Sequence, residues 1–176
     1  MLDVRSKYLN LFAYTGGATL AAAAAGAQVT HVDASKGMVT WAKENAVSSG
    51  LGDAPIRWLV DDCVKFVERE IRRGNTYDAI IMDPPSYGRG PKGEIWKIED
   101  MIHPLIKLCT KILSKDALFF LVNSYTTGLA PAVLTYMIST ELKPWNGHVD
   151  SQEIGLPVTD SGLVLPCGAS GRWERD

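Results

Sequence analysis

Short runs of apolar residues alternate along the chain with longer amphipathic segments, and glycine, proline or acidic residues separate them. The runs predict buried strands and the amphipathic segments predict helices. The expected strands are 8–13, 28–32, 56–60, 77–82 and 117–122, and the expected helices are 18–25, 35–50, 63–73, 99–113 and 128–142. Two late strands, near 148–154 and 162–166, are expected to form a hairpin through the connection 156–162.

Strict alternation of strands and helices implies a parallel sheet with right-handed crossovers and helices on both faces. The late pair adds an antiparallel edge to this sheet. We therefore expect an α/β fold in one domain that spans residues 1–176. In such sheets, ligands bind outside the carboxyl ends of the strands. Four expected strands end there in candidate polar groups, namely Thr15-Gly16, Asp33, Asp61-Asp62 and Asp83.

The segment Asp83-Pro84-Pro85-Ser86-Tyr87 is the most specific chemical signal in the chain. Its prolines fix φ and lack an N–H group, so the segment continues neither a sheet nor a helix, and its carbonyls are left free. An acid, free carbonyls and a ring at the end of a strand suit a planar substrate that donates hydrogen bonds, such as a nucleobase. A rigid turn with no catalytic role would have the same pattern. The residues at the ends of the other strands are therefore needed to tell a catalytic loop from a structural turn.

A glycine turn at Gly16 after the first strand and an acid, Asp33, after the second are typical of sites for nucleoside-bearing cofactors. The glycine permits close backbone approach, and the acid accepts hydrogen bonds from ribose hydroxyls. The sequence matches neither G-x-G-x-x-G nor GxxxxGK[ST], which favours a cofactor with ribose and adenine but no phosphate, such as S-adenosylmethionine. Asp61 or Asp62 would then face the adenine amine, although any one of these acids alone could be a solvated loop carboxylate.

Together, the segments 9–17, 32–35, 61–62 and 83–87 resemble the class I S-adenosylmethionine-dependent methyltransferases, and more narrowly the family of ribosomal RNA large subunit methyltransferases I and K. The resemblance covers about Tyr8 to Val122 and implies a Rossmann-like, mostly parallel seven-stranded sheet with an antiparallel late hairpin. It implies a catalytic site of Asp83, Pro84 and Tyr87, in which Tyr87 would stack on a flipped-out base. It also implies a cofactor pocket formed by Phe12, Tyr14, Thr15, Gly16, Asp33, Ala34, Asp61, Asp62 and Asp83. Of the two adjacent acids, Asp62 is favoured over Asp61 as the contact of the adenine.

Two features depart from that family. Members that make 5-methylcytosine carry a cysteine soon after the fifth strand, whereas this chain has Asn123-Ser124-Tyr125-Thr126 there. We therefore expect a nitrogen to accept the methyl group, with Cys167 in a glycine-rich turn as the alternative nucleophile for carbon-5 methylation. Relatives also place a basic RNA-binding domain or a sizeable segment before the first strand. We accordingly expect a catalytic fragment that lacks an N-terminal substrate-binding segment, or an enzyme that relies on a partner.

The segment Gly88–Lys97 follows the Asp83 loop and contains Arg89, Lys92 and Trp96 among flexible glycines. It predicts either a lid whose basic residues touch phosphate or a solvated loop anchored to the core by Trp96.

Composition restricts the partners further. A net charge of −2, from 18 basic and 20 acidic residues, provides no basic surface for a phosphate backbone, so RNA binding should need help. The three cysteines and three histidines show no metal-ligand spacing, and no apolar run is long enough for a membrane span. An odd cysteine count without a secretory segment argues for the cytoplasm.

We expect a cytoplasmic methyltransferase acting on a base in RNA, most readily ribosomal RNA. A small-molecule or protein methyltransferase and a scaffold without cofactor are the alternatives.

Overall fold

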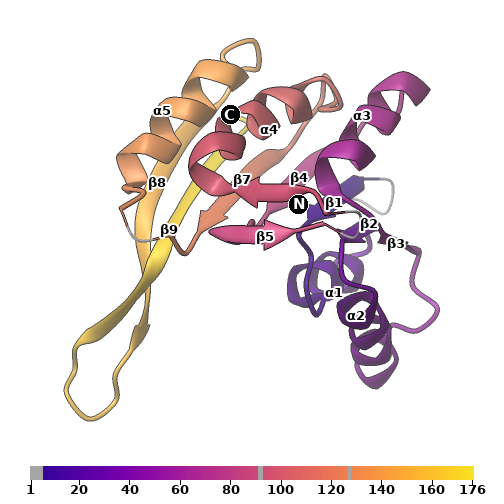
Figure 1. Cartoon of the computed structure of the whole chain (residues 1–176), viewed down its shortest axis with the longest axis horizontal. Coiled ribbons are helices and arrows are strands. Elements are labelled where there is room, and N and C mark those ends of the chain that lie inside the picture. Colours follow the sequence, from indigo (N-terminus) through magenta and orange to yellow (C-terminus); the bar gives the residue numbers. More distant parts are fainter. Residues whose placement is uncertain (1–5, 91–92, 127) are drawn as a thin grey trace.

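The computed structural model describes residues 6–90, 93–126 and 128–176, which form one large sheet with helices on both faces (Figure 1). The elements follow the chain in the order β1 (Lys7–Leu11), α1 (Gly17–Ala24), β2 (Gln28–Asp33), α2 (Lys36–Ser48), β3 (Ile56–Val60), α3 (Cys63–Arg73), β4 (Ala79–Met82), β5 (Tyr87–Arg89), β6 (Ile95–Lys97), α4 (Ile98–Thr110), β7 (Phe119–Ser124), α5 (Pro131–Leu142), β8 (His148–Pro157) and β9 (Val164–Glu174).

The large sheet has seven strands in the order β3-β2-β1-β4-β7-β9-β8. The neighbours from β3 to β7 are parallel, whereas β9 runs antiparallel to both β7 and β8. This confirms the expected α/β fold with its antiparallel late hairpin. Because the strand order reverses between β1 and β4, a crevice opens beside the carboxyl ends of these two strands, which is where such sheets bind ligands.

Helices α3, α4 and α5 cover one face of the sheet, and α1 and α2 cover the other (Figure 1). The larger core cluster lies under the first group and includes Phe66, Ile80 and Phe120, all fully buried. A smaller cluster around Tyr8 and Val29 lies on the opposite face, where alanines of α1 allow the helix to approach the sheet closely. Each large apolar side chain buried in this way contributes about 1.5–3 kcal/mol to stability.

Polar residues at the strand ends also start the helices that follow. The Ser35 hydroxyl accepts a hydrogen bond from the Met38 N–H at 3.4 Å and caps α2, as the sequence predicts. The Asp62 carboxylate caps α3 by accepting from the Lys65 N–H at 2.9 Å. These caps satisfy N–H groups that have no partner within the helix, and they fix the strand-to-helix turns in place.

Replacing Ser35 by alanine is expected to lower the free energy of unfolding by about 1 kcal/mol, because the first turn of α2 loses its cap. Urea denaturation of the ligand-free protein measures this change. Ser48→Ala is the control, since this exposed serine lies in the last turn of α2, where alanine is a better helix former. Equal stability of the Ser35 variant and the wild type would show that the cap contributes nothing.

The structure corrects three sequence predictions. The expected polar loop after the Asp83 segment is a hairpin of β5 and β6, in which Gly88 pairs with Trp96. The fourth strand begins at Ala79, and Tyr77 forms only an isolated bridge with Leu113. The late strands are longer than expected, and the expected glycine-rich turn 166–171 lies inside β9.

The glycines of that segment serve close packing, which explains the error. Gly168 has a φ of 146°, and a Cβ added there would lie 2.1 Å from the carbonyl oxygen of Ser124 at the end of β7. A residue with a side chain would therefore push β9 away from β7. Glycine inside a strand often marks such a close approach of two backbones.

Candidate active site at the carboxyl ends of the strands

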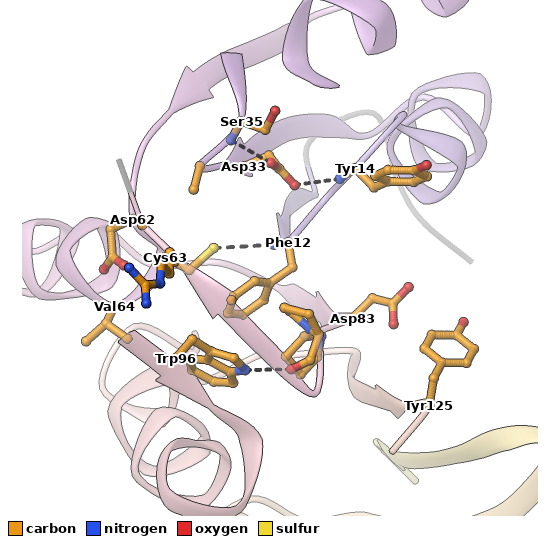
Figure 2. Close-up of a pocket in the computed structure, with 16 residues that line it drawn as sticks. Phe12, Tyr14, Asp33, Ser35, Asp62, Cys63, Val64, Asp83, Trp96 and Tyr125 are labelled. Carbon is orange, nitrogen blue, oxygen red and sulfur yellow. Dashed lines mark hydrogen bonds between the residues drawn. The ribbon is translucent and has the colours of Figure 1, made fainter. Parts of the chain in front are cut away.

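A cavity of about 430 Å³ lies at the carboxyl ends of β1, β2 and β4 (Figure 2). Of the predicted site residues, seven line it: Phe12, Tyr14, Asp33, Ala34, Asp62, Asp83 and Pro84. The described lining also includes Ser35, Cys63, Val64, Pro85, Gly88, Arg89, Gly90, Trp96 and Tyr125. Residues far apart in the sequence therefore meet here because parallel strands end at the same edge. Thr15, Gly16, Asp61 and Tyr87 are absent from the described lining.

The loop after β1 has an unusual backbone. Phe12 and Tyr14 have φ values of 55° and 49°, in the left-handed region that side chains other than glycine rarely adopt. Two hydrogen bonds hold this conformation: the Phe12 N–H donates to the Cys63 sulfur at 3.3 Å, and the Tyr14 N–H donates to the Asp33 carboxylate at 2.9 Å. Residues of β2 and α3 thus fix the loop after β1.

Gly16 and Thr15 shape this loop without lining the cavity. Gly16 has a φ of 87° at the start of α1, and a Cβ added there would lie 3.1 Å from the Ala42 side chain of α2. The Thr15 carbonyl accepts a hydrogen bond from the Asn45 side chain at 3.0 Å. Both residues therefore hold α1 and α2 in position behind the cavity.

Asp33 at the end of β2 has its carboxylate fixed by two backbone groups. One oxygen accepts from the Tyr14 N–H, and the other accepts from the Ser35 N–H at 2.8 Å. Each carboxylate oxygen can accept a further hydrogen bond. The arrangement therefore leaves acceptor sites on Asp33 for donors of a ligand in the cavity.

The structure separates the two adjacent acids after β3. Asp61 forms an ion pair with Arg69 on α3, and its other oxygen accepts from the Asp62 N–H at 2.9 Å. Asp62 lines the cavity, and only one of its oxygens, Oδ1, caps α3. Asp62, the acid that the sequence favours at the adenine, therefore keeps one oxygen outside the helix cap, while Asp61 anchors the helix, and the role of Asp62 at a ligand stays a prediction.

Asp83 at the end of β4 is half-buried, and its buried Oδ1 has no hydrogen-bond partner within the described part of the chain. Burial raises the pKa of this carboxyl to about 6, and the nearby Tyr125 hydroxyl opposes the shift. Figure 2 shows the Asp83 carboxyl and the Tyr125 ring close together at one side of the cavity. A buried acceptor without a partner costs free energy unless a ligand satisfies it.

The sequence assigned no site role to Cys63, Val64 or Tyr125, which all line the cavity, and Tyr125 lies next to Asp83. It follows β7, the strand next to β4, and its side chain lines the cavity beside Asp83. The segment 123–126 lacks the cysteine found in relatives that make 5-methylcytosine, and nothing in its sequence alone assigns a role to the tyrosine. Its place just after a strand end was the available signal, because the other lining residues, Phe12, Asp33, Asp62 and Asp83, have the same placement.

The β5–β6 hairpin forms another wall of the cavity. The Trp96 indole N–H donates to the Pro85 carbonyl at 2.7 Å, and the Trp96 ring packs against Phe12 with centroids 4.9 Å apart. Trp96 is only 8% exposed, which agrees with the alternative that Trp96 anchors the segment 88–97 to the core. Arg89 lies in the cavity wall, whereas Lys92 lies outside the described residues.

Tyr87 lies on the outer side of this hairpin. Its side chain is 52% exposed, and its hydroxyl accepts a hydrogen bond from the Arg89 guanidinium at 3.3 Å. The predicted stacking of Tyr87 on a base stays a prediction, and a base that reached Tyr87 would lie outside this cavity.

Within the described ranges, no group of three or more histidine, cysteine, aspartate or glutamate residues is arranged to hold a metal ion. Among the helices in those same ranges, none has the length and apolar character needed to cross a membrane.

Comparison with known proteins gives the class of this fold and site. Residues 3–139 match the family model of S-adenosylmethionine-dependent methyltransferases, and the chain belongs to this family. Its relatives include the ribosomal RNA large subunit methyltransferase K/L of Shewanella frigidimarina, 37% identical over 57% of this chain and 15% of that protein. The ribosomal RNA large subunit methyltransferase K of Neisseria meningitidis is 32% identical over 67% of this chain and 34% of that protein. The family expected from the sequence motifs is therefore confirmed, and the chain spans only a minor part of these relatives.

Solved structures agree on the fold. The S-adenosylmethionine-dependent methyltransferase from Agrobacterium tumefaciens superimposes with a TM-score of 0.93 at 44% identity, over 100% of this chain and 58% of that one. SMU.776, described as a putative methyltransferase complexed with S-adenosylhomocysteine, has a TM-score of 0.77 at 24% identity, over 96% of this chain and 45% of that one, and at this identity supports the fold alone.

Proposed function

We propose that this chain is the catalytic domain of a cytoplasmic S-adenosylmethionine-dependent methyltransferase that modifies a nitrogen of a base in RNA, most directly ribosomal RNA. The observation that carries the proposal is the meeting of three acids, Asp33, Asp62 and Asp83, in one cavity at the ends of three strands. Acids at neighbouring strand ends provide acceptors for ribose hydroxyls, for an amine and for a reacting group.

The residues of the cavity fit the cofactor. Asp33 would accept hydrogen bonds from the ribose hydroxyls, and Asp62 would accept from the adenine amine. Phe12, Cys63 and Val64 supply apolar surface between these acids. The hydrogen bonds within the protein leave acceptor positions on both carboxylates for a ligand. Each oxygen of Asp33 can accept a further hydrogen bond, and one oxygen of Asp62 takes no part in the helix cap. When bound, the cofactor supplies a methyl group on a sulfonium sulfur, which makes that carbon electrophilic.

Asp83 is proposed to position the acceptor nitrogen and to take its proton. The N–H of the acceptor nitrogen would donate to Asp83, which would hold that nitrogen in place and take the proton that it loses on methylation. With a pKa near 6, the carboxyl is mostly ionised at neutral pH and is also a better proton acceptor than an exposed aspartate. The Pro84 backbone carbonyl would help to orient the same nitrogen. Positioning in a dry cavity is the main catalytic requirement of such a displacement.

Two lines of support favour RNA as the substrate. The relatives from Shewanella and Neisseria carry names that state activity on large-subunit ribosomal RNA. The cavity also combines an unsatisfied acid with a neighbouring ring, Tyr125, which suits a planar heterocycle. The net charge of −2 is the one observation that favours a small-molecule or protein acceptor instead.

Calorimetric titration with S-adenosylhomocysteine tests the proposed function directly. We expect one binding site per chain, because the residues assigned to the cofactor all lie within the described structure. Asp53→Asn is the control, since Asp53 is an exposed loop residue outside the cavity. Absence of binding by the wild-type chain would contradict the proposal.

RNA affinity of the isolated chain is expected to be poor, because the net charge is −2 and basic residues do not outnumber acidic ones. A gel-shift titration with ribosomal RNA fragments at physiological salt should show no discrete complex below about 1 µM, the lower end of non-specific binding. A tight, sequence-specific complex would show that the chain recognises RNA without help, and Arg89 would then be the first residue to mutate.

A further inference from the structure

The β5–β6 hairpin stands apart from the large sheet and forms one wall of the candidate active site. Its two strands make a separate two-stranded sheet, and Gly88, Arg89 and Gly90 line the cavity. An isolated hairpin of two strands is marginally stable in water, so its position depends on its contacts with the rest of the protein. The structure describes such contacts both at the base of the hairpin and at its outer end.

The base of the hairpin is fixed to the loop after β4. The Trp96 indole N–H donates to the Pro85 carbonyl, as Figure 2 shows, and the Ile98 N–H donates to the Ser86 carbonyl at 3.1 Å. The Trp96 ring is buried and packs against Phe12. These contacts hold the base firmly, so a movement of the hairpin would pivot here.

The outer end of the hairpin is held to α3 by an ion pair. The Lys65 ammonium pairs with the Glu94 carboxylate, and the two side chains are 48% and 23% exposed. The Gly90 N–H donates to the Glu94 carbonyl at 2.8 Å, and a Cβ added at Gly90 would displace the Glu94 carboxylate. Because an ion pair exposed to water is weak, this contact opens more easily than the buried base does.

The same lysine belongs to the proposed cofactor site. Its backbone N–H donates to the carboxylate of Asp62 at 2.9 Å, and Asp62 is the acid proposed above for the adenine amine. The lining of the cavity includes Asp62 and Val64 at the start of α3 as well as Arg89 on the hairpin. A cofactor bound there would lie between α3 and the hairpin, and the pair of Lys65 and Glu94 joins these two walls.

We propose that Lys65 and Glu94 form a latch that holds the β5–β6 hairpin closed over the bound cofactor, and that opening of this latch sets the rate at which the cofactor leaves the cavity. The inference rests on the cofactor site proposed above. Each turnover leaves S-adenosylhomocysteine in the site, which must depart before the next methyl donor enters. In many enzymes, lid opening or product release of this kind limits turnover. Both residues are positioning residues, because they act on the cofactor through the hairpin.

Surface plasmon resonance of the immobilised chain measures the rate at which S-adenosylhomocysteine dissociates. Lys65→Gln and Glu94→Gln should each raise this rate by roughly twofold to fivefold, the range expected for loss of a solvent-exposed ion pair. The double variant Lys65→Glu/Glu94→Lys, which reverses the pair, should return the rate toward that of the wild type. Added salt should raise the rate of the wild type and leave that of the single variants nearly unchanged, because salt screens exposed charges.

Amide hydrogen exchange of the ligand-free chain gives a second readout. The Gly90 N–H, which donates to the Glu94 carbonyl, should exchange faster in both single variants and at the wild-type rate in the reversed pair. Lys43→Gln and Glu44→Gln are the matched controls, since each removes one charge from the exposed surface of α2 and should change neither rate. Thermal unfolding like that of the wild type shows that the variants are folded.

The outcomes separate the latch from the proposed function. Dissociation that is as slow in the single variants as in the wild type overturns the latch, and so does a reversed pair that behaves like the single variants. Equal exchange at Gly90 in all variants overturns it as well. In each of these cases the chain still binds S-adenosylhomocysteine, and the proposed function stands. Failure of the wild-type chain to bind S-adenosylhomocysteine overturns both.

Discussion

Replacing Asp83 by alanine is expected to lower turnover by about two to four orders of magnitude, the range typical of losing a positioned proton acceptor. Oδ1 of this half-buried carboxyl has no hydrogen-bond partner among the residues that the structure describes, and the substitution removes the group proposed to hold the reacting nitrogen. Transfer of a labelled methyl group from S-adenosylmethionine to ribosomal RNA measures the effect. Affinity for S-adenosylhomocysteine should change much less than turnover does.

The same carboxyl predicts a pH dependence. Because its pKa is raised to about 6, Asp83 becomes protonated as the pH falls through that value and can no longer accept the N–H of the substrate. The rate should therefore rise with pH through about 6 and level off above it, and residual activity of an Asp83→Asn variant should lack this step. A wild-type profile that is flat from pH 5 to pH 8 would argue against Asp83 as the proton acceptor.

Cys167→Ser separates the two acceptor hypotheses. Under the nitrogen hypothesis no covalent bond to the enzyme is needed, and the variant should retain most activity. Cys167 lines a second cavity that shares Tyr125 with the candidate active site, so the carbon-5 alternative also has its thiol near that site. A covalent complex with 5-fluorocytosine RNA that forms in the wild type and is lost in Cys167→Ser would establish that alternative.

Asp33→Ala is expected to weaken S-adenosylhomocysteine binding by about 1–3 kcal/mol, a factor of roughly 5 to 150. The substitution removes the acceptor proposed for the ribose, and it also frees the Tyr14 and Ser35 N–H groups that hold the first loop. Calorimetry measures the affinity, and Asp53→Ala in an exposed loop serves as the matched control. Binding equal to that of the wild type would remove Asp33 from the cofactor site.

Much of the fold follows from local patterns in the sequence. The run Ile56–Val60 forms β3 with the expected ends, and Ser35 caps α2 as expected, because apolar runs and capping residues act within a few residues. The ends of the late strands were not predictable in the same way. Pro166 and the glycines at 168 and 171 favour a turn locally, and only packing against β7 and α5 explains why this segment is a strand.

The candidate site shows the same division. The acids Asp33, Asp62 and Asp83 were predictable, because each follows directly after a strand and parallel strands end together. The position of Tyr125 beside Asp83 depends on the pairing of β7 with β4, in which Val122 lies opposite Met82 although the two residues are 40 positions apart in the sequence. Register of this kind is fixed by tertiary pairing and has no signal within a single segment.

The left-handed backbone at Phe12 and Tyr14 has a consequence for engineering. Each such residue costs about 1–2 kcal/mol relative to an ordinary conformation, whereas glycine adopts it freely. Selection for heat tolerance alone would therefore favour glycine at Tyr14, whose side chain is 60% exposed, but not at Phe12, whose ring packs on Trp96. Glycine at Tyr14 would remove part of the cavity wall. Variants enriched for thermal resistance should consequently accumulate a defect in catalysis at this loop, so any such screen needs activity as a second criterion.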